Sequence, residues 1–190
     1  MLKTHYEAYN PMKVVIFFVQ EVMPKCFRAN YLPTYQAVML SLGYIVYLIN
    51  KVQRMNVKGL KKFEIGEKYY FEDLGLRNCK QHLDYSTDIN KLMENAVFQH
   101  LKMLNYQVYV GKMGDLEIDF IGIKDKRKIY IQVAYLIADE KTKEREFGNL
   151  LKIDNNYRKY VITLDSFSSG TNYQGIEHIH LRDFLKRSEL

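Results

Sequence analysis

The chain lacks the features of a disulfide-stabilised, zinc-binding or membrane-spanning protein. Its 190 residues include two cysteines, Cys26 and Cys79, and neither belongs to a Cys-x-x-Cys pair or lies near a paired histidine. Two isolated thiols predict reduced cysteines rather than a disulfide framework or a zinc site. The most apolar run, residues 37–49, is shorter than the roughly 18–20 residues of a membrane helix. We therefore expect a cytoplasmic protein with no membrane partner.

Tryptophan is absent as well, and so is the glycine-rich motif with which ATPases bind phosphate. No G-x-x-x-x-G-K-[ST] sequence occurs, because the spacing from Gly59 to Lys68 is wrong for it. The chain alone is therefore not expected to bind or hydrolyse ATP. The aromatic residues are 16 Tyr and 10 Phe, which favour strands. With 47% hydrophobic and 26% charged residues, the composition predicts a globular protein with a core.

Positive charge is concentrated in one short stretch. The formal net charge is +6, and residues 51–70 carry six basic against two acidic residues. A basic surface of this kind attracts polyanions, with an affinity that falls as salt rises. DNA is therefore an expected partner, and the residues predicted to contact it are Lys51, Arg54, Lys58, Lys61 and Lys62.

The first part of the chain is divided into two segments. Residues 1–33 contain an apolar stretch between two prolines and receive no assignment. Residues 34–80 predict a helix over 34–50, with Thr34 as its N-cap, followed by short strands over 51–72. A helix and a basic hairpin have the outline of a winged helix. The alternative is a helix packed on a solvated hairpin.

Residues 81–190 predict an α/β domain. Apolar residues recur at helical spacing from Ile89 to Leu104, which indicates an amphipathic helix. Strands are expected over 106–113, 116–124 and 128–137, a helix over 139–153, and further strands over 159–165 and 176–181, before a short final helix. The helix between the third and fourth strands of this series is a crossover connection, so those two strands should be parallel.

This α-β-β-β-α-β order resembles the restriction-endonuclease-like core of the PD-(D/E)xK superfamily. That superfamily uses a helix Glu, an Asp on the second strand and Glu-x-Lys or Asp-x-Lys on the third to hold Mg²⁺ and orient water. The matching residues here are Glu94, Asp119 and Gln132, while Ala134 stands in place of the lysine. The resemblance implies Asp119 as a weak metal ligand, no other cofactor, and a degenerate site that does not cut DNA.

Each of these residues also has a purely structural interpretation. Glu94 fits an exposed helix position, Asp119 fits a strand carboxylate paired with a neighbour such as Lys112, and Gln132 fits a hydrogen-bonded core amide. A lysine supplied from elsewhere would keep the site active, and Lys112 and Lys128 are the candidates.

A more specific resemblance covers residues 34–188. The chain is similar to the C-terminal domain of a family of prokaryotic AAA-type ATPases, a domain of unknown function numbered 4143 in its series. The resemblance is carried by "GEKYYFEDLGLRN" (66–78), "LMENAVFQHL" (92–101), "YQVYVGKMGDLEIDF" (106–120) and the stretch 128–165. It implies that the Gln-Val-Ala variant is usual in this branch. It also implies an ATPase module and a winged helix upstream, and a role for Arg145 of the "REF" element at the site or toward a partner.

Three functions follow from these observations. The favoured one is a non-cutting nuclease-fold module that binds DNA. The second is a Mg²⁺-dependent nuclease that uses a displaced lysine. The third is a protein-interaction or oligomerisation domain, with an ATPase or a second copy of the chain as partner. His178 and His180 form an H-x-H pair with no evident third ligand, which favours a structural role over a metal site.

Overall fold

A computed structural model describes residues 49–58, 62–74, 85–137, 139–165 and 170–190. The chain divides into two units, residues 1–49 and residues 50–190, and almost every described residue belongs to the second. Residues 1–33, which received no assignment, lie outside the described residues. So does the helix predicted over 34–50, except for its last two residues, which begin a strand.

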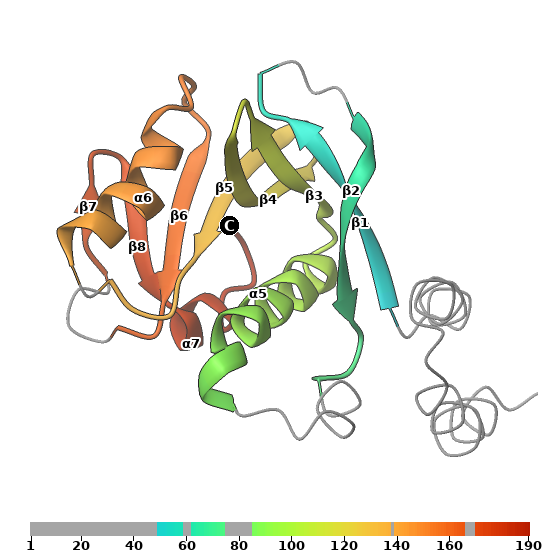
Figure 1. Cartoon of the computed structure of the whole chain (residues 1–190), viewed down its shortest axis with the longest axis horizontal. Coiled ribbons are helices and arrows are strands. Elements are labelled where there is room, and N and C mark those ends of the chain that lie inside the picture. Colours follow the sequence, from blue (N-terminus) through green and yellow to red (C-terminus); the bar gives the residue numbers. More distant parts are fainter. Residues whose placement is uncertain (1–48, 59–61, 75–84, 138, 166–169) are drawn as a thin grey trace, which may run out of the picture. The chain divides into compact units, whose positions relative to one another are not determined.

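One mixed sheet holds the described part of the second unit together (Figure 1). Its strands lie in the order β2-β1-β3-β4-β5-β6-β8-β7. The strands are β1 (Ile49–Asn56), β2 (Lys62–Phe71), β3 (Gln107–Met113), β4 (Leu116–Lys124), β5 (Arg127–Val133), β6 (Arg158–Thr163), β7 (Asn172–Tyr173) and β8 (Ile176–His180). The helices are α5 (Tyr85–Met103), α6 (Glu140–Leu151) and α7 (Leu181–Phe184).

The predicted α/β class and element order are confirmed. The elements α5, β3, β4, β5, α6 and β6 follow one another as expected, and β5 and β6 are parallel, with Gln132 beside Val161. β3, β4 and β5 pair antiparallel. The crossover through α6 explains the parallel pair, because two parallel neighbours need a long connection between them.

We expected a domain boundary near residue 80, but strands from both sides of that point belong to one sheet. β1 pairs parallel with β3, placing Arg54 beside Val110, and β2 follows β1 at the edge of the same sheet. Val52 and Tyr70 are buried in the core with residues of α5. The strands predicted as the wing of a winged helix therefore complete the α/β sheet.

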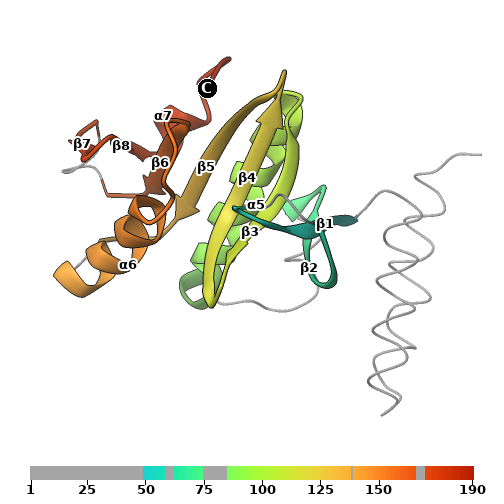
Figure 2. The same cartoon turned by 90° about the horizontal axis from the view of Figure 1, so that it is seen from above.

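The helices cover opposite faces of this sheet. α5 and α7 bury Phe98, Leu101 and Phe184 against one face, and α6 buries Phe147 and Leu150 against the other. Neighbouring strand residues alternate between the two cores, as a pleated strand requires. Figure 2 shows α5 running along β3 and β4, and α6 lying beside β6.

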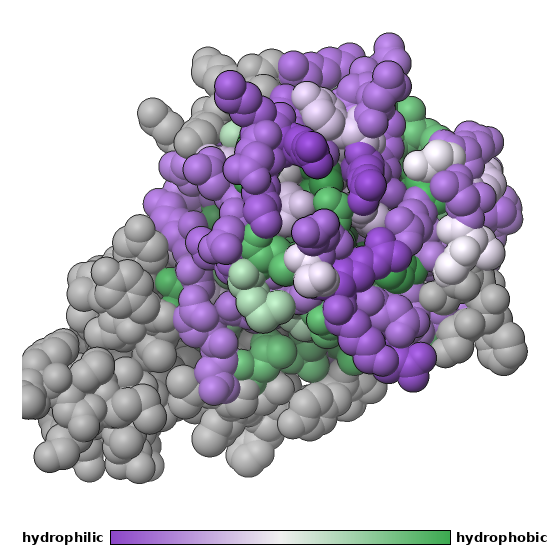
Figure 3. All heavy atoms as spheres, turned by 180° about the vertical axis from the view of Figure 1, so that it is seen from behind, coloured by the Kyte–Doolittle hydropathy of each residue, from purple (hydrophilic) through white to green (hydrophobic). Residues whose placement is uncertain are grey.

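One face of the molecule is largely polar where it is described. Figure 3 shows hydrophilic side chains over most of the described part of this face, with hydrophobic side chains between them near its centre and lower edge. In the ranges that the structure describes, no helix is long and apolar enough to cross a membrane.

A β-bulge interrupts β4 beside the predicted site. Tyr109 pairs with Ile121, but Gly111 pairs with Ile118, so β4 has one residue more than β3 across this step. A bulge of this kind re-aims side chains and is common next to functional sites. Gly111 permits the close approach, because a Cβ there would lie 2.8 Å from the Cβ of Ile118.

We predict that Gly111→Ala destabilises the protein by about 1–3 kcal/mol, the usual cost of overpacking a core. The added methyl would push Ile118 and the bulge outward. Urea denaturation measures the free energy of unfolding. Gly148→Ala is the matched control, since α6 has open space there and alanine stabilises a helix by about 0.5–1 kcal/mol over glycine. Equal stability of Gly111→Ala and the wild type would contradict this account of the bulge.

Candidate functional site

The candidate site begins where β4 and β5 separate. Their paired register ends at Phe120 and Ile131, one step before Asp119 and Gln132. Beyond that point Asp119 Oδ2 accepts a hydrogen bond from the backbone N–H of Val133 at 2.9 Å, and Gln132 Oε1 accepts from the N–H of Asp119 at 3.4 Å. Each side chain thus satisfies the backbone of the opposite strand, and both are held at the fork.

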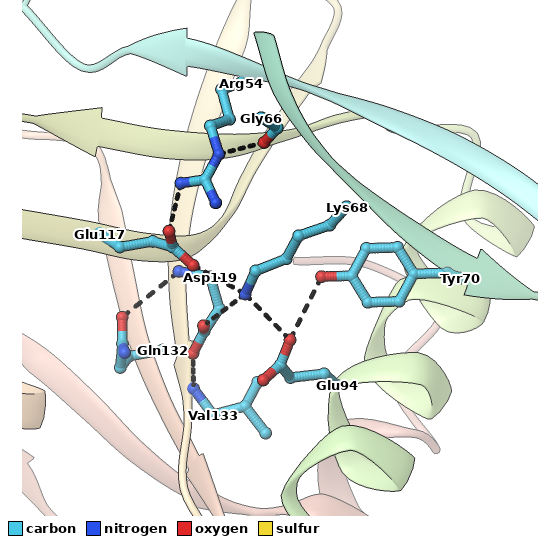
Figure 4. A network of polar contacts seen from close by, with 9 residues as sticks. All are labelled: Arg54, Gly66, Lys68, Tyr70, Glu94, Glu117, Asp119, Gln132 and Val133. Carbon is cyan, nitrogen blue, oxygen red and sulfur yellow. Dashed lines mark hydrogen bonds and ion pairs between the residues drawn. The ribbon is translucent and has the colours of Figure 1, made fainter. Parts of the chain in front are cut away.

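A lysine from β2 reaches this fork (Figure 4). The ammonium group of Lys68 lies 2.8 Å from Glu117, 3.2 Å from Glu94 and 3.5 Å from Asp119. The three carboxylates come from α5 and β4, so Lys68 joins the edge strand to both. One ammonium therefore serves three acidic groups, two of them on the bulged strand.

Further contacts orient the members of this cluster. The Tyr70 hydroxyl donates to Glu94 at 3.3 Å, and the Tyr70 ring stacks on Phe98 with 4.7 Å between ring centroids. Arg54 forms an ion pair with Glu117 and donates to the carbonyl of Gly66. Glu117 is thus held by two cations, while Glu94 is held by a cation and a phenol.

A further carboxylate faces the same cleft from α6. Glu146 is 3% exposed, and one of its oxygens accepts from Arg145 Nε at 2.8 Å and Nη2 at 2.6 Å. Its other oxygen, Oε2, is buried with no hydrogen-bond partner among the described residues. The cleft has a volume of about 740 Å³, and the carboxylates that line it are Glu94, Asp115, Glu117, Asp119 and Glu146.

The pKa of Asp119 reflects this crowding of negative charge. Burial is the largest cause and raises the pKa, and Glu94 raises it further, whereas Lys68 and the Val133 N–H lower it; the net pKa is about 7. The opposite holds for Glu117, whose pKa burial would raise but whose contacts with Lys68 and Arg54 lower it overall. The crowding of negative charge therefore favours the protonated form of Asp119, while Glu117 stays ionised.

Lys68 is a permanent cation in this setting. Burial alone would lower its pKa, but the charges of Asp119, Glu94 and Glu117 outweigh burial and raise it. A lysine that stays protonated cannot serve as a general base. It can donate hydrogen bonds and offer positive charge to an anion.

The carboxylate oxygens of the cleft are of the chemical type that binds a hard divalent cation. Glu94, Asp119 and Glu146 offer carboxylate oxygens, which Mg²⁺ and Mn²⁺ prefer. The unpartnered Glu146 oxygen is the observation that supports this fit, since a buried carboxylate oxygen needs a donor or a cation. Within the described ranges no three acidic, histidine or cysteine groups stand ready as a ligand set. A cation would have to draw at least one carboxylate away from Lys68.

The predicted catalytic residues Glu94, Asp119 and Gln132 line this one cleft, and their chemical roles stay predictions. Sequence reasoning missed Lys68, Glu117 and Glu146 as members of the site. Lys68 and Tyr70 are two residues apart on β2, so their side chains lie on the same face, but nothing in the sequence relates that face to β4.

The displaced-lysine candidates lie elsewhere. Lys112 sits beside Glu117 in the β3–β4 register. Neither Lys112 nor Lys68 is among the described residues that line the cleft, but Lys68 reaches three of the site's carboxylates from β2. Lys128 lies over the ring of Tyr157 at 5.3 Å, toward the start of β5 and away from the fork.

The predicted DNA-binding residues are partly engaged within the chain. Lys51 pairs with Glu67 at 2.7 Å, and Arg54 pairs with Glu117. Lys58 is exposed, and the side chains of Lys61 and Lys62 lie outside the described residues. Less of the basic stretch is therefore available to a polyanion than its charge count suggests.

The two histidines of the H-x-H pair have separate partners. His178 is buried and its Nε2 lies 2.8 Å from the Thr163 hydroxyl. His180 Nδ1 accepts from the backbone N–H of Arg182 and caps α7. These contacts give both rings structural partners.

Comparison with known proteins leaves the function to be argued from the site. No family model matches the chain. An uncharacterized protein of Haemophilus influenzae is 33% identical over 179 residues, which cover 94% of this chain and 42% of that protein. The chain thus spans less than half the length of this relative. Protein VC1899 from Vibrio cholerae aligns over 80% of this chain and 40% of its own, with 13% identity and a TM-score of 0.31.

The raised pKa of Asp119 predicts a pH-dependent stability difference from Asp119→Asn. A carboxyl with a raised pKa contributes stability that is full below its unfolded pKa, near 3.8, and is lost as pH rises through about 7. The amide does not ionise, so the variant should gain stability relative to the wild type between pH 4 and 7, and the gap should then level off. Urea denaturation across this range measures the free energy of unfolding of both proteins, with exposed Asp125→Asn as the control. A stability difference between variant and wild type that shrinks as pH rises would refute the raised pKa of Asp119.

Proposed function

We propose that this cleft is the site of a divalent-cation-dependent phosphodiesterase of the nuclease type, in which Lys68 replaces the missing lysine of the third strand. The observation that carries the proposal is the position of the Lys68 ammonium, within 3.5 Å of Glu94, Glu117 and Asp119 at the β4–β5 fork. Nucleases of the PD-(D/E)xK type place a lysine beside their acidic metal ligands. Any strand that brings an ammonium group to that point in space can supply it.

The roles of the residues follow from their environment. Glu94, Asp119 and Glu146 would hold the divalent cation, which offsets charge on the scissile phosphate and lowers the pKa of water when bound. Lys68 stays protonated, so it donates to the attacking water or to a phosphate oxygen and balances the developing charge. Gln132 is neutral and supports the fork through its contact with Asp119. Tyr70 orients Glu94.

A non-cutting DNA-binding module is the second candidate, and one observation favours it. Lys68 already pairs with all three carboxylates around it, so a built-in ammonium supplies part of the charge that a metal ion would bring. Ala134 adds no second amine and Gln132 adds no negative charge. An interaction domain within an AAA-type ATPase is supported by the family resemblance alone.

We predict metal-dependent cleavage of DNA by the 190-residue chain. Mg²⁺ or Mn²⁺ should support cutting of labelled single-stranded and duplex substrates, EDTA should stop it, and Asp119→Asn should slow it by about 100-fold or more. Denaturing gels resolve the products. The control is Asp125→Asn in an exposed turn, which should cut at the wild-type rate. Failure of the wild type to cut with either metal would refute the proposed activity.

Lys68→Met separates the two candidates. Under the proposal the variant loses cleavage yet binds Mn²⁺ more tightly than the wild type, because no ammonium competes for the carboxylates. Under the second candidate the wild type neither cuts nor binds Mn²⁺, and only the variant binds it. Titration calorimetry measures the binding, and Lys68→Arg, which keeps the charge, is the matched control. Circular dichroism confirms that each variant is folded.

A further inference from the structure

One wall of the acidic cleft is aromatic and apolar. Tyr135 and Leu136 line the cleft together with Glu94 and Asp119, and they are 45% and 42% exposed. They follow directly on Val133 and Ala134, which are buried at the end of β5. Two large side chains thus stay accessible where the strand leaves the core, a few residues beyond the fork.

The backbone of this wall is fixed rather than free. Ala134 N–H donates to the carbonyl of Ile162 at 3.0 Å, and the carbonyl of Tyr135 accepts from Leu164 N–H at 3.0 Å. These bonds continue the pairing of β5 with β6 past the end of the regular strand. The Tyr135 ring is therefore carried by an anchored backbone, as a preorganised contact surface requires.

Cationic and polar groups from α6 line the same cleft. Arg145 is held by Glu146 through one carboxylate oxygen, while 69% of its side chain remains exposed. Thr142 and Asn149 also line the cleft from α6. The cleft thus combines an aromatic wall, an exposed guanidinium and an acidic floor that favours a cation.

We propose that the cleft takes a nucleotide whose base is unpaired, with the base stacked on Tyr135 and a flanking phosphate at Arg145. This inference rests on the proposed function, because it names the substrate class of the same site as single-stranded nucleic acid. A base within a duplex already has both faces covered by its neighbours, whereas an unpaired base offers a face to an aromatic side chain. In an intact duplex, no base has an open face that could stack on an exposed tyrosine beside the proposed phosphodiesterase centre.

The charge of the cleft also favours a single-stranded nucleic acid held by stacking. The acidic floor repels a bare phosphate backbone, so a divalent cation must be bound before a phosphate can approach it. Stacking on Tyr135 is independent of charge and holds the nucleotide while the phosphate meets Arg145. Tyr157 offers a comparison, since it is 39% exposed but lies beside Lys128, away from the fork.

Fluorescence anisotropy of the full chain with a labelled oligothymidylate, alone and annealed to its complement, tests the inference. Ca²⁺ serves as the cation, and a gel verifies that the probe stays intact. The single strand should bind more tightly than the duplex. Tyr135→Ala should weaken single-strand binding by about tenfold, while Tyr135→Phe, which keeps the ring, should not. Tyr157→Ala is the matched control and should bind as the wild type does.

Equal affinity for single strand and duplex, no effect of Tyr135→Ala, or no binding by the wild type would each overturn the inference. Its failure is distinguishable from failure of the proposed function. Cleavage that depends on Asp119 but ignores Tyr135 and strand pairing leaves the phosphodiesterase in place and removes the stacking site. Loss of single-strand binding in Tyr135→Ala without any cleavage by the wild type supports the stacking site and removes the enzyme.

Discussion

The arrangement of the site depends on the ion pairs of one ammonium group, that of Lys68. Three carboxylates converge from α5 and β4 on this one ammonium, those of Glu94, Glu117 and Asp119, each within 3.5 Å of it. Like charges gathered around one point repel strongly where water is scarce. Lys68 turns this repulsion into attraction and ties β2 to the core. In a flat sheet, two intervening strands would place β2 about 14 Å from β4. The contact between Lys68 and β4 therefore requires the sheet to curve, as the turned β1 and β2 of Figure 2 illustrate.

The second constraint is backbone geometry at the fork. The bulge in β4 adds one residue opposite Val110, and regular β4–β5 pairing stops at Phe120. Without these two irregularities, strict alternation would continue through Asp119 and its carboxylate would face an ordinary strand neighbour. Gly111 makes the bulge possible by leaving space for Ile118. A residue without a side chain, one strand away, thus helps determine where the carboxylate points.

Local patterns in the sequence were sufficient for the elements from α5 to β6 and insufficient for the place of β1 and β2 or for the whole site. Hydrophobic periodicity predicted α5, the three antiparallel strands, α6 and the parallel β6, because each pattern lies within one element. Glu94, Asp119 and Gln132 came from the resemblance of that order to the PD-(D/E)xK core, and their chemical roles stay predictions. Lys68 could not be predicted in this way, since its partners are 26, 49 and 51 residues away and depend on sheet curvature. The bulge could not either, because "LEIDFIGIK" reads as a regular strand.

The competition for the carboxylate oxygens of Asp119 links these features to function. Two positive species can satisfy this buried carboxylate within the chain, a proton and the Lys68 ammonium, and the proposed divalent cation would be a third. Arg54 and Arg145 are already engaged with Glu117 and Glu146, so they cannot relieve Asp119. Lys68 is shared among three acids, which is why burial and Glu94 still raise the pKa of Asp119. If Glu94, Asp119 and Glu146 held a divalent cation as proposed, Asp119 would be ionised and drawn away from Lys68, and the Lys68 ammonium would be available to donate to a phosphate oxygen.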